Sequence, residues 1–80
     1  MPENSLLLTQ EEHRELGREL RLSEARLREL CDVVVAVYGP HNRASFSFQK
    51  MLDSMSRLRG DLQGQVDRDY PGYNMEGTYL

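Results

Sequence analysis

The sequence predicts an all-α protein, an antiparallel two-helix hairpin followed by a short aromatic C-terminal tail. Apolar residues recur every three or four positions over residues 10–38 and again over residues 46–69, which is the spacing of one face of an α-helix. Gly39-Pro40 separates the two stretches and Pro71-Gly72 follows the second; both dipeptides end helices. With 80 residues and no internal repeat, the chain makes one small domain.

The first helix is expected over residues 10–38, after an N-terminal extension of residues 1–8. Thr9 and Glu12 have the spacing of a capping box, in which each side chain accepts a hydrogen bond from the other residue's N–H. Gly39 can adopt the left-handed conformation that ends a helix. The β-branched run 33–38 also fits a buried strand, but the helical phase continues through it and no partner strand is evident, so we favour a helix.

A turn over residues 39–45 and a second helix over residues 46–69 complete the hairpin. Asn42 or Ser45 would cap this helix. The last ten residues, 71–80, are richer in aromatic and apolar side chains than a disordered tail. We therefore expect the tail to pack against the hairpin or against a partner.

The apolar stripes of the two helices give the expected core and dimer interface. Two cylinders touch only along a line, so a lone hairpin cannot bury both stripes. Two hairpins packed face to face would form a four-helix bundle with a shared core, and we expect such a homodimer; the alternative is another protein that supplies the missing helices. The interface residues are Leu16, Leu20, Leu27, Leu30, Val34, Tyr38, Phe48, Met51, Leu52, Met55, Leu58, Leu62 and Val66, and Leu22, Val33 and Val35 would extend it.

Composition disfavours several classes of partner. The net charge is −3, with 13 acidic and 10 basic residues, so nucleic-acid binding gains little from phosphate neutralisation. The longest apolar run, residues 33–38, is far shorter than a membrane-spanning helix, and the N-terminus lacks the pattern of a signal peptide. A single cysteine, Cys31, cannot form an internal disulfide. We expect a cytoplasmic protein that binds neither nucleic acid nor a membrane.

Two features contain residue types that occur in chemical sites. The cluster Glu11-Glu12-His13-x-Glu15-x-x-x-Glu19 contains metal-ligand residue types, but it lacks the Glu-x-x-His spacing of di-iron bundles and is interpreted as a capped, solvated first turn. Cys31 lies on the core stripe and is interpreted as a small buried hydrophobe. No nucleophile, phosphate-binding or zinc motif is present in the sequence, and we expect no metal, no cofactor and no enzyme activity.

These observations favour a small interaction or structural protein that acts as a helical dimerisation or adaptor module, with itself and another protein as partners. The expected partner contacts are Phe46, Tyr73, Tyr79 and Leu80. The alternative is a small-ligand binder or enzyme whose site forms between chains from glutamates and arginines of the first helix, the arginines being Arg14, Arg18, Arg21 and Arg28. A weaker alternative is an acidic regulator of a nucleic-acid-binding protein.

Overall fold

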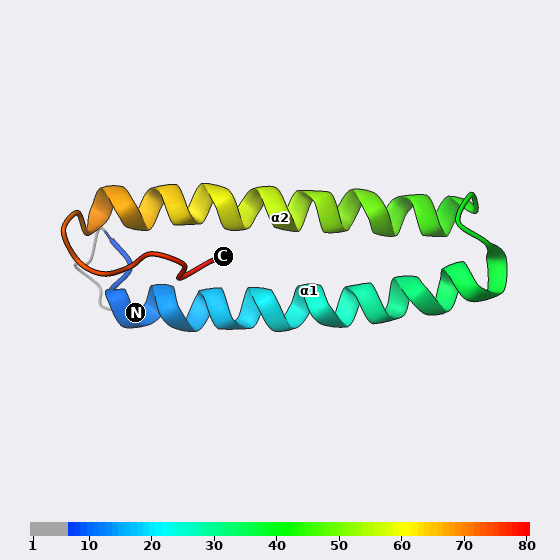
Figure 1. The fold of residues 1–80 in the computed structure, drawn as a ribbon, viewed down its shortest axis with the longest axis horizontal. Coiled ribbons are helices and arrows are strands. Elements are labelled where there is room, and N and C mark those ends of the chain that lie inside the picture. The colour runs from blue at the N-terminus through cyan, green and yellow to red at the C-terminus, as the bar shows by residue number, and fades with distance from the viewer. Residues whose placement is uncertain (1–6) are drawn as a thin grey trace.

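The computed structural model describes residues 7–80 and contains two helices, α1 (Gln10–Tyr38) and α2 (Arg43–Asp69). The helices lie side by side and antiparallel, joined by a short turn (Figure 1). The predicted all-α hairpin is therefore confirmed. Most of the predicted N-terminal extension, residues 1–6, lies outside the described residues.

Helix α1 begins at the predicted capping box. The Thr9 hydroxyl accepts from the Glu12 N–H at 3.0 Å, and the Glu12 carboxylate accepts from the Thr9 N–H at 2.8 Å. Residues 33–38 are helical rather than a strand. The helix ends at Gly39, whose φ of +88° suits glycine and whose N–H donates to the Val35 carbonyl at 2.8 Å.

Helix α2 begins at Arg43, three residues earlier than predicted. The reason is the cap: the Asn42 side chain accepts from the Ala44 N–H at 2.8 Å, so the turn between the helices is shorter than residues 39–45. Ser45 is buried and its hydroxyl donates to the Gly39 carbonyl at 2.8 Å, which fixes the turn to the start of α2. The helix ends at Asp69, as predicted, with Tyr70 as its C-cap.

After α2 the chain reverses and the tail runs back between the two helices (Figure 1). Gly72 and Gly77 have φ values of +84° and +72° and form the bends of this segment. Met75 and Tyr79 are 2% and 0% exposed and form the apolar core with Val66. The core thus lies at the end of the hairpin where α1 begins and α2 ends.

The molecule is long and thin. Its principal extents are 47 × 23 × 16 Å, and its radius of gyration is 15.9 Å, against roughly 12 Å for a compact domain of this length. Within residues 7–80, neither helix is long and apolar enough to cross a membrane. The tail packs against both helices at the core end, where Arg21 of α1 and Gln63 of α2 bond its backbone.

Candidate functional site

The two helices meet along a seam of residues spaced by seven, or about two helical turns. This seam is half polar, which the apolar stripes of the sequence did not predict. Its buried or largely buried members are Gly17, Glu24 and Cys31 on α1 and Ser45, Leu52, Arg59 and Val66 on α2.

Glu24 and Arg59 form an ion pair at the centre of the seam. Arg59 Nε and Nη2 donate to the two carboxylate oxygens of Glu24 at 3.0 and 3.2 Å, and Arg28 Nη2 donates to the same carboxylate at 2.9 Å. The hydrogen bond from Arg28 and the charge of Arg59 lower the pKa of Glu24 although its burial opposes this. Arg59 Nη1 also donates to the Tyr79 carbonyl at 3.1 Å, so this arginine joins α1, α2 and the tail.

The tail backbone lies against both helices at a site that we call the tail groove. This site is formed by Gly17, Arg21, Glu24, Arg59 and Gln63. Besides Arg59, two side chains and one glycine hold the tail there. The Gln63 amide donates to the Met75 carbonyl and accepts from the Tyr79 N–H, both at 3.0 Å. Arg21 Nη1 donates to the Thr78 carbonyl at 2.6 Å. A Cβ on Gly17 would lie 2.2 Å from the Thr78 carbonyl oxygen, so only glycine allows this approach.

His13 closes the end of the tail groove. It is 1% exposed, and its Nδ1 makes a 2.6 Å hydrogen bond with the Tyr79 hydroxyl. The rings of Tyr70 and Tyr79 pack edge-on against it. Its Nε2 has no hydrogen-bond partner and lies 4.0 Å from Asp69 Oδ2. Burial raises the pKa of Tyr79.

The first-turn interpretation is therefore right for the cap and wrong for His13. Helix α1 begins with the predicted capping box, but the histidine side chain points inward because it lies on the same face as Gly17 and Glu24, one and three turns further on. No group of three His, Cys, Asp or Glu side chains that could hold a metal ion occurs within residues 7–80.

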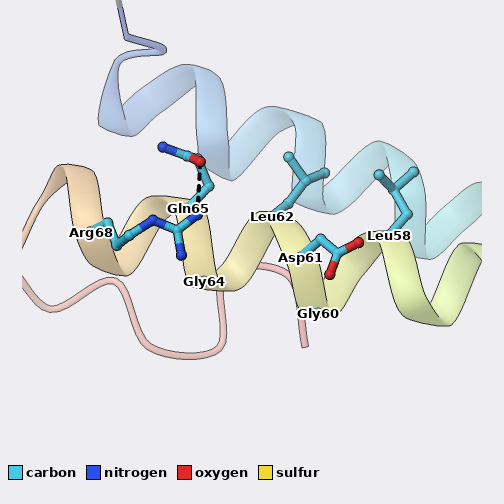
Figure 2. A pocket seen from close by; sticks show the side chains of 7 residues that line it. All are labelled: Leu58, Gly60, Asp61, Leu62, Gly64, Gln65 and Arg68. Carbon is cyan, nitrogen blue, oxygen red and sulfur yellow. Dashed lines mark hydrogen bonds between the residues drawn. The ribbon is translucent and has the colours of Figure 1, made fainter.

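The side of the hairpin that points away from Arg21 is apolar on both helices. Successive residues of a helix are rotated by 100°, so Arg21 lies about 60° around α1 from Glu24 and Leu30 lies about 120° from it in the other direction. On α2, Leu58 and Leu62 project together from one side of the helix (Figure 2). We call this the apolar face. Its members are Leu16, Leu20, Leu27, Leu30, Val34 and Val37 on α1 and Ala44, Phe48, Met51, Met55, Leu58 and Leu62 on α2. Of these, Leu16, Leu20 and Leu62 also pack partly against the core of Val66, Met75 and Tyr79.

Three of the predicted interface residues on this face stay largely open to solvent. Leu30, Met51 and Leu58 are 39%, 47% and 44% exposed. The half-buried members of the prediction are Leu16, Leu20, Leu27, Val34, Phe48, Met55 and Leu62, whereas Leu52 and Val66 are buried in the seam and Tyr38, at the end of α1, is 68% exposed.

Three of the four predicted partner contacts are exposed to solvent and one is buried. Phe46, Tyr73 and Leu80 are 60%, 60% and 70% exposed. Tyr79 as an outward partner contact is wrong, because its side chain is fully buried against His13 and Val66. Cys31 is buried, as predicted, with the Gln49 amide 3.7 Å from its sulfur.

The four α1 arginines proposed for a ligand site do not converge within the chain. Arg14, Arg18 and Arg28 pair with glutamates of the same helix. Arg21 donates to the Thr78 carbonyl, and Arg14 also lies 3.5 Å from the Met75 sulfur. The geometry therefore assigns these arginines to helix stabilisation and tail binding.

A shallow depression of about 450 Å³ lies along α2 where Gly60 and Gly64 carry no side chain (Figure 2). Arg68 donates to the Gln65 side chain at 2.9 Å across its rim. It is open, and all seven of its lining residues belong to α2. Comparison of the chain with protein-family models, with curated proteins and with solved structures found no match.

Proposed function

We propose that the protein is a non-enzymatic helical interaction module that forms a homodimer through its apolar face. The observation that carries this proposal is the row of half-buried and exposed leucine, valine, methionine and phenylalanine side chains that runs along both helices. Soluble monomers rarely expose an apolar patch that runs along a whole molecule, and such patches mark interaction sites.

The spacing of this face supports a helical partner. Leu20, Leu27 and Val34 recur every seven residues, and Leu30 and Val37 each follow three residues after a member of this series. On α2 the face alternates steps of four and three from Ala44 to Leu62. Alternating steps of three and four are the pattern of helices that pack at a small crossing angle in coiled coils and four-helix bundles.

A second copy fits because both faces would be covered at once. Two identical faces related by a two-fold axis are self-complementary in their apolar character, and the product is a four-helix bundle. The molecule is 47 Å long and 23 Å wide, so a contact along its whole length is on the scale of the roughly 800 Å² that each partner buries in a typical stable interface.

The core of the single chain is small, which is the physical reason for pairing. Its buried apolar side chains within residues 7–80 are Cys31, Leu52, Val66, Met75 and Tyr79. Each fully buried side chain of this kind contributes about 1.5–3 kcal/mol, and dimerisation would add the members of the apolar face to this set. A reducing cytoplasm is the compartment we propose, because the lone thiol is kept buried and unpaired.

Light scattering coupled to size-exclusion chromatography tests the proposal. The wild-type chain should have a mass of twice 9.3 kDa that persists over a dilution series. Leu30→Glu places a charge on the apolar face and should give a monomer under the same conditions. Leu22→Glu is the matched control. The sequence pattern added Leu22 to the interface, but this residue, 58% exposed, lies about 160° around α1 from Glu24 and so faces away from α2; the dimer should remain.

Two results would contradict the homodimer. One is a helical wild-type chain that is monomeric at every concentration, which would leave the apolar face to a different protein. The other is a dimer that Leu30→Glu and Leu22→Glu affect equally, because the contact would then lie elsewhere.

A further inference from the structure

We propose that the tail groove is a peptide-recognition site, occupied in this structure by the chain's own tail, which also binds an extended Met-x-Gly-x-Tyr segment supplied by a partner protein. The groups that bond the tail backbone, Arg21, Arg59 and Gln63, are not members of the apolar face. The inference does not depend on dimerisation.

The first observation is that the groove binds main chain. Gln63 makes two hydrogen bonds with the backbone of Met75 and Tyr79. Arg21 and Arg59 donate to the Thr78 and Tyr79 carbonyls. Main-chain capture by fixed polar groups, with pockets for selected side chains, is how proteins recognise extended peptides.

The second observation is that the groove is built from polar groups where a simple core would use apolar ones. Gln63 and Glu24 are 8% and 7% exposed, and Arg59 is held in place by Glu24. Burying such groups is costly unless each has a partner. The tail backbone supplies partners for Gln63 and Arg59, so the sequence of the helices is arranged around a bound peptide strand.

The third observation defines the ligand. Met75 and Tyr79 fill the two buried positions, and Gly77 between them has a φ of +72°, which other residues rarely adopt. The Tyr79 hydroxyl pairs with His13 Nδ1, so phenylalanine at this position would leave a buried nitrogen without a partner. The chemical class is therefore a peptide with methionine, glycine and tyrosine at alternate positions.

The tail acts as a tethered competitor. A segment joined to α2 by a few residues has an effective concentration in the millimolar range, so a free peptide binds readily only when the tail is released. None of the contacts with residues 75–79 requires that the peptide be covalently joined to α2, because each is a hydrogen bond or a buried side chain.

The test uses the full 80-residue chain and a fluorescein-labelled peptide with the sequence of residues 70–80. A tail-released chain, Met75→Asp with Tyr79→Asp, keeps every groove residue. Fluorescence anisotropy should show saturable binding to this chain with a Kd at least tenfold lower than for wild type. A peptide carrying Tyr79→Phe should bind at least threefold more weakly than the natural peptide.

Groove dependence is tested in the tail-released chain with two glycine substitutions. Gly17→Ala places a Cβ against the position of the Thr78 carbonyl and should abolish binding. Gly60→Ala is the matched control, because a Cβ there meets nothing within 4 Å, and binding should persist.

A tail-released chain that stays helical by circular dichroism but binds no peptide would overturn the proposal, as would binding that Gly17→Ala leaves unchanged. If the double substitution unfolds the helices, Gly77→Val replaces it, since this change strains only the bend of the attached tail. In the wild-type chain, millimolar peptide should displace the tail and so speed the amide hydrogen exchange of residues 75–80. If this exchange is unchanged and the Gly77→Val chain also binds no peptide, the tail groove is not a peptide site.

Discussion

Gly17→Ala is the substitution that most directly tests how the tail is held. Alanine is normally preferred to glycine inside a helix by about 1 kcal/mol, so the change would stabilise α1 if nothing lay against it. At position 17 the added Cβ would be 2.2 Å from the Thr78 carbonyl oxygen, whereas ordinary contact begins at 3.4 Å. The tail or the helix must therefore move by about 1.2 Å, the difference between these distances.

The expected magnitude follows from the contacts that this movement disturbs. Displacing Thr78 weakens its hydrogen bond to Arg21, of a type worth about 1.5–3 kcal/mol when one partner is charged. Forcing an extra methyl group into a packed site costs about 1–3 kcal/mol by itself. After subtraction of the helix-propensity gain, we expect a net loss of about 2 kcal/mol in the free energy of unfolding.

Urea and thermal unfolding at one fixed protein concentration, followed by circular dichroism, measure this loss. Gly60→Ala is the control, because its Cβ would meet open space, and it should raise the free energy of unfolding by up to about 1 kcal/mol. In a domain of this size 1 kcal/mol shifts the Tm by about 4–8 °C, so the two variants should move in opposite directions. If Gly17→Ala stabilises the protein as much as Gly60→Ala does, the tail does not rest on α1 at this point and the reasoning fails.

Four other predictions concern single interactions. Arg59→Met leaves Glu24 buried with one fewer cation and should cost about 3 kcal/mol in urea unfolding; a loss under about 1 kcal/mol would contradict the role given to the pair. Because Arg28 and Arg59 lower the pKa of Glu24, the ionised carboxylate contributes its full share to the free energy of unfolding above the ordinary pKa of 4.5, and this share falls as the pH drops through the lowered pKa. Glu24→Gln should remove this pH dependence. Because burial raises the pKa of Tyr79, the neutral side chain should contribute fully to the free energy of unfolding below pH 10.0, and this contribution should be lost as the pH rises through the raised pKa. Tyr79→Phe should abolish this alkaline loss of stability; an unchanged loss would show that another group titrates. Thr9→Ala should cost about 1 kcal/mol through the capping box, whereas Ser54→Ala, at an exposed position inside α2, should change stability little.

The helices were predictable because their signals are local. Thr9 and Glu12 are three residues apart, and Gly39 lies at the residue where α1 stops. The predicted start of α2 is three residues late because Asn42 and Ser45 are both good caps, and only the fold shows that Ser45 is used to bind the Gly39 carbonyl.

The tail groove was not predictable from the sequence because its contacts join residues far apart in the chain. Glu24 and Arg59 are 35 positions apart, and His13 and Tyr79 are 66 apart. Each residue had a plausible local role: Glu24 as a partner of Arg28, Tyr79 as an exposed aromatic. A usable signal did exist, since Gly17 interrupts a stretch, residues 10–22, that is otherwise rich in good helix formers, and a glycine in such a place often has a packing reason.

The position of the tail also determines how the molecule would respond to force. The start of α1 and the tail lie at the same end of the hairpin (Figure 1), and the hydrogen bond between His13 and Tyr79 joins them there. A force applied to the two ends of the chain would act first on this hydrogen bond and then on the Gln63 contacts. The two helices would then separate, starting at the end where α1 begins and α2 ends and proceeding toward residues 39–42. Because these bonds would break in succession rather than together, we expect the chain to unfold at low force and to extend gradually.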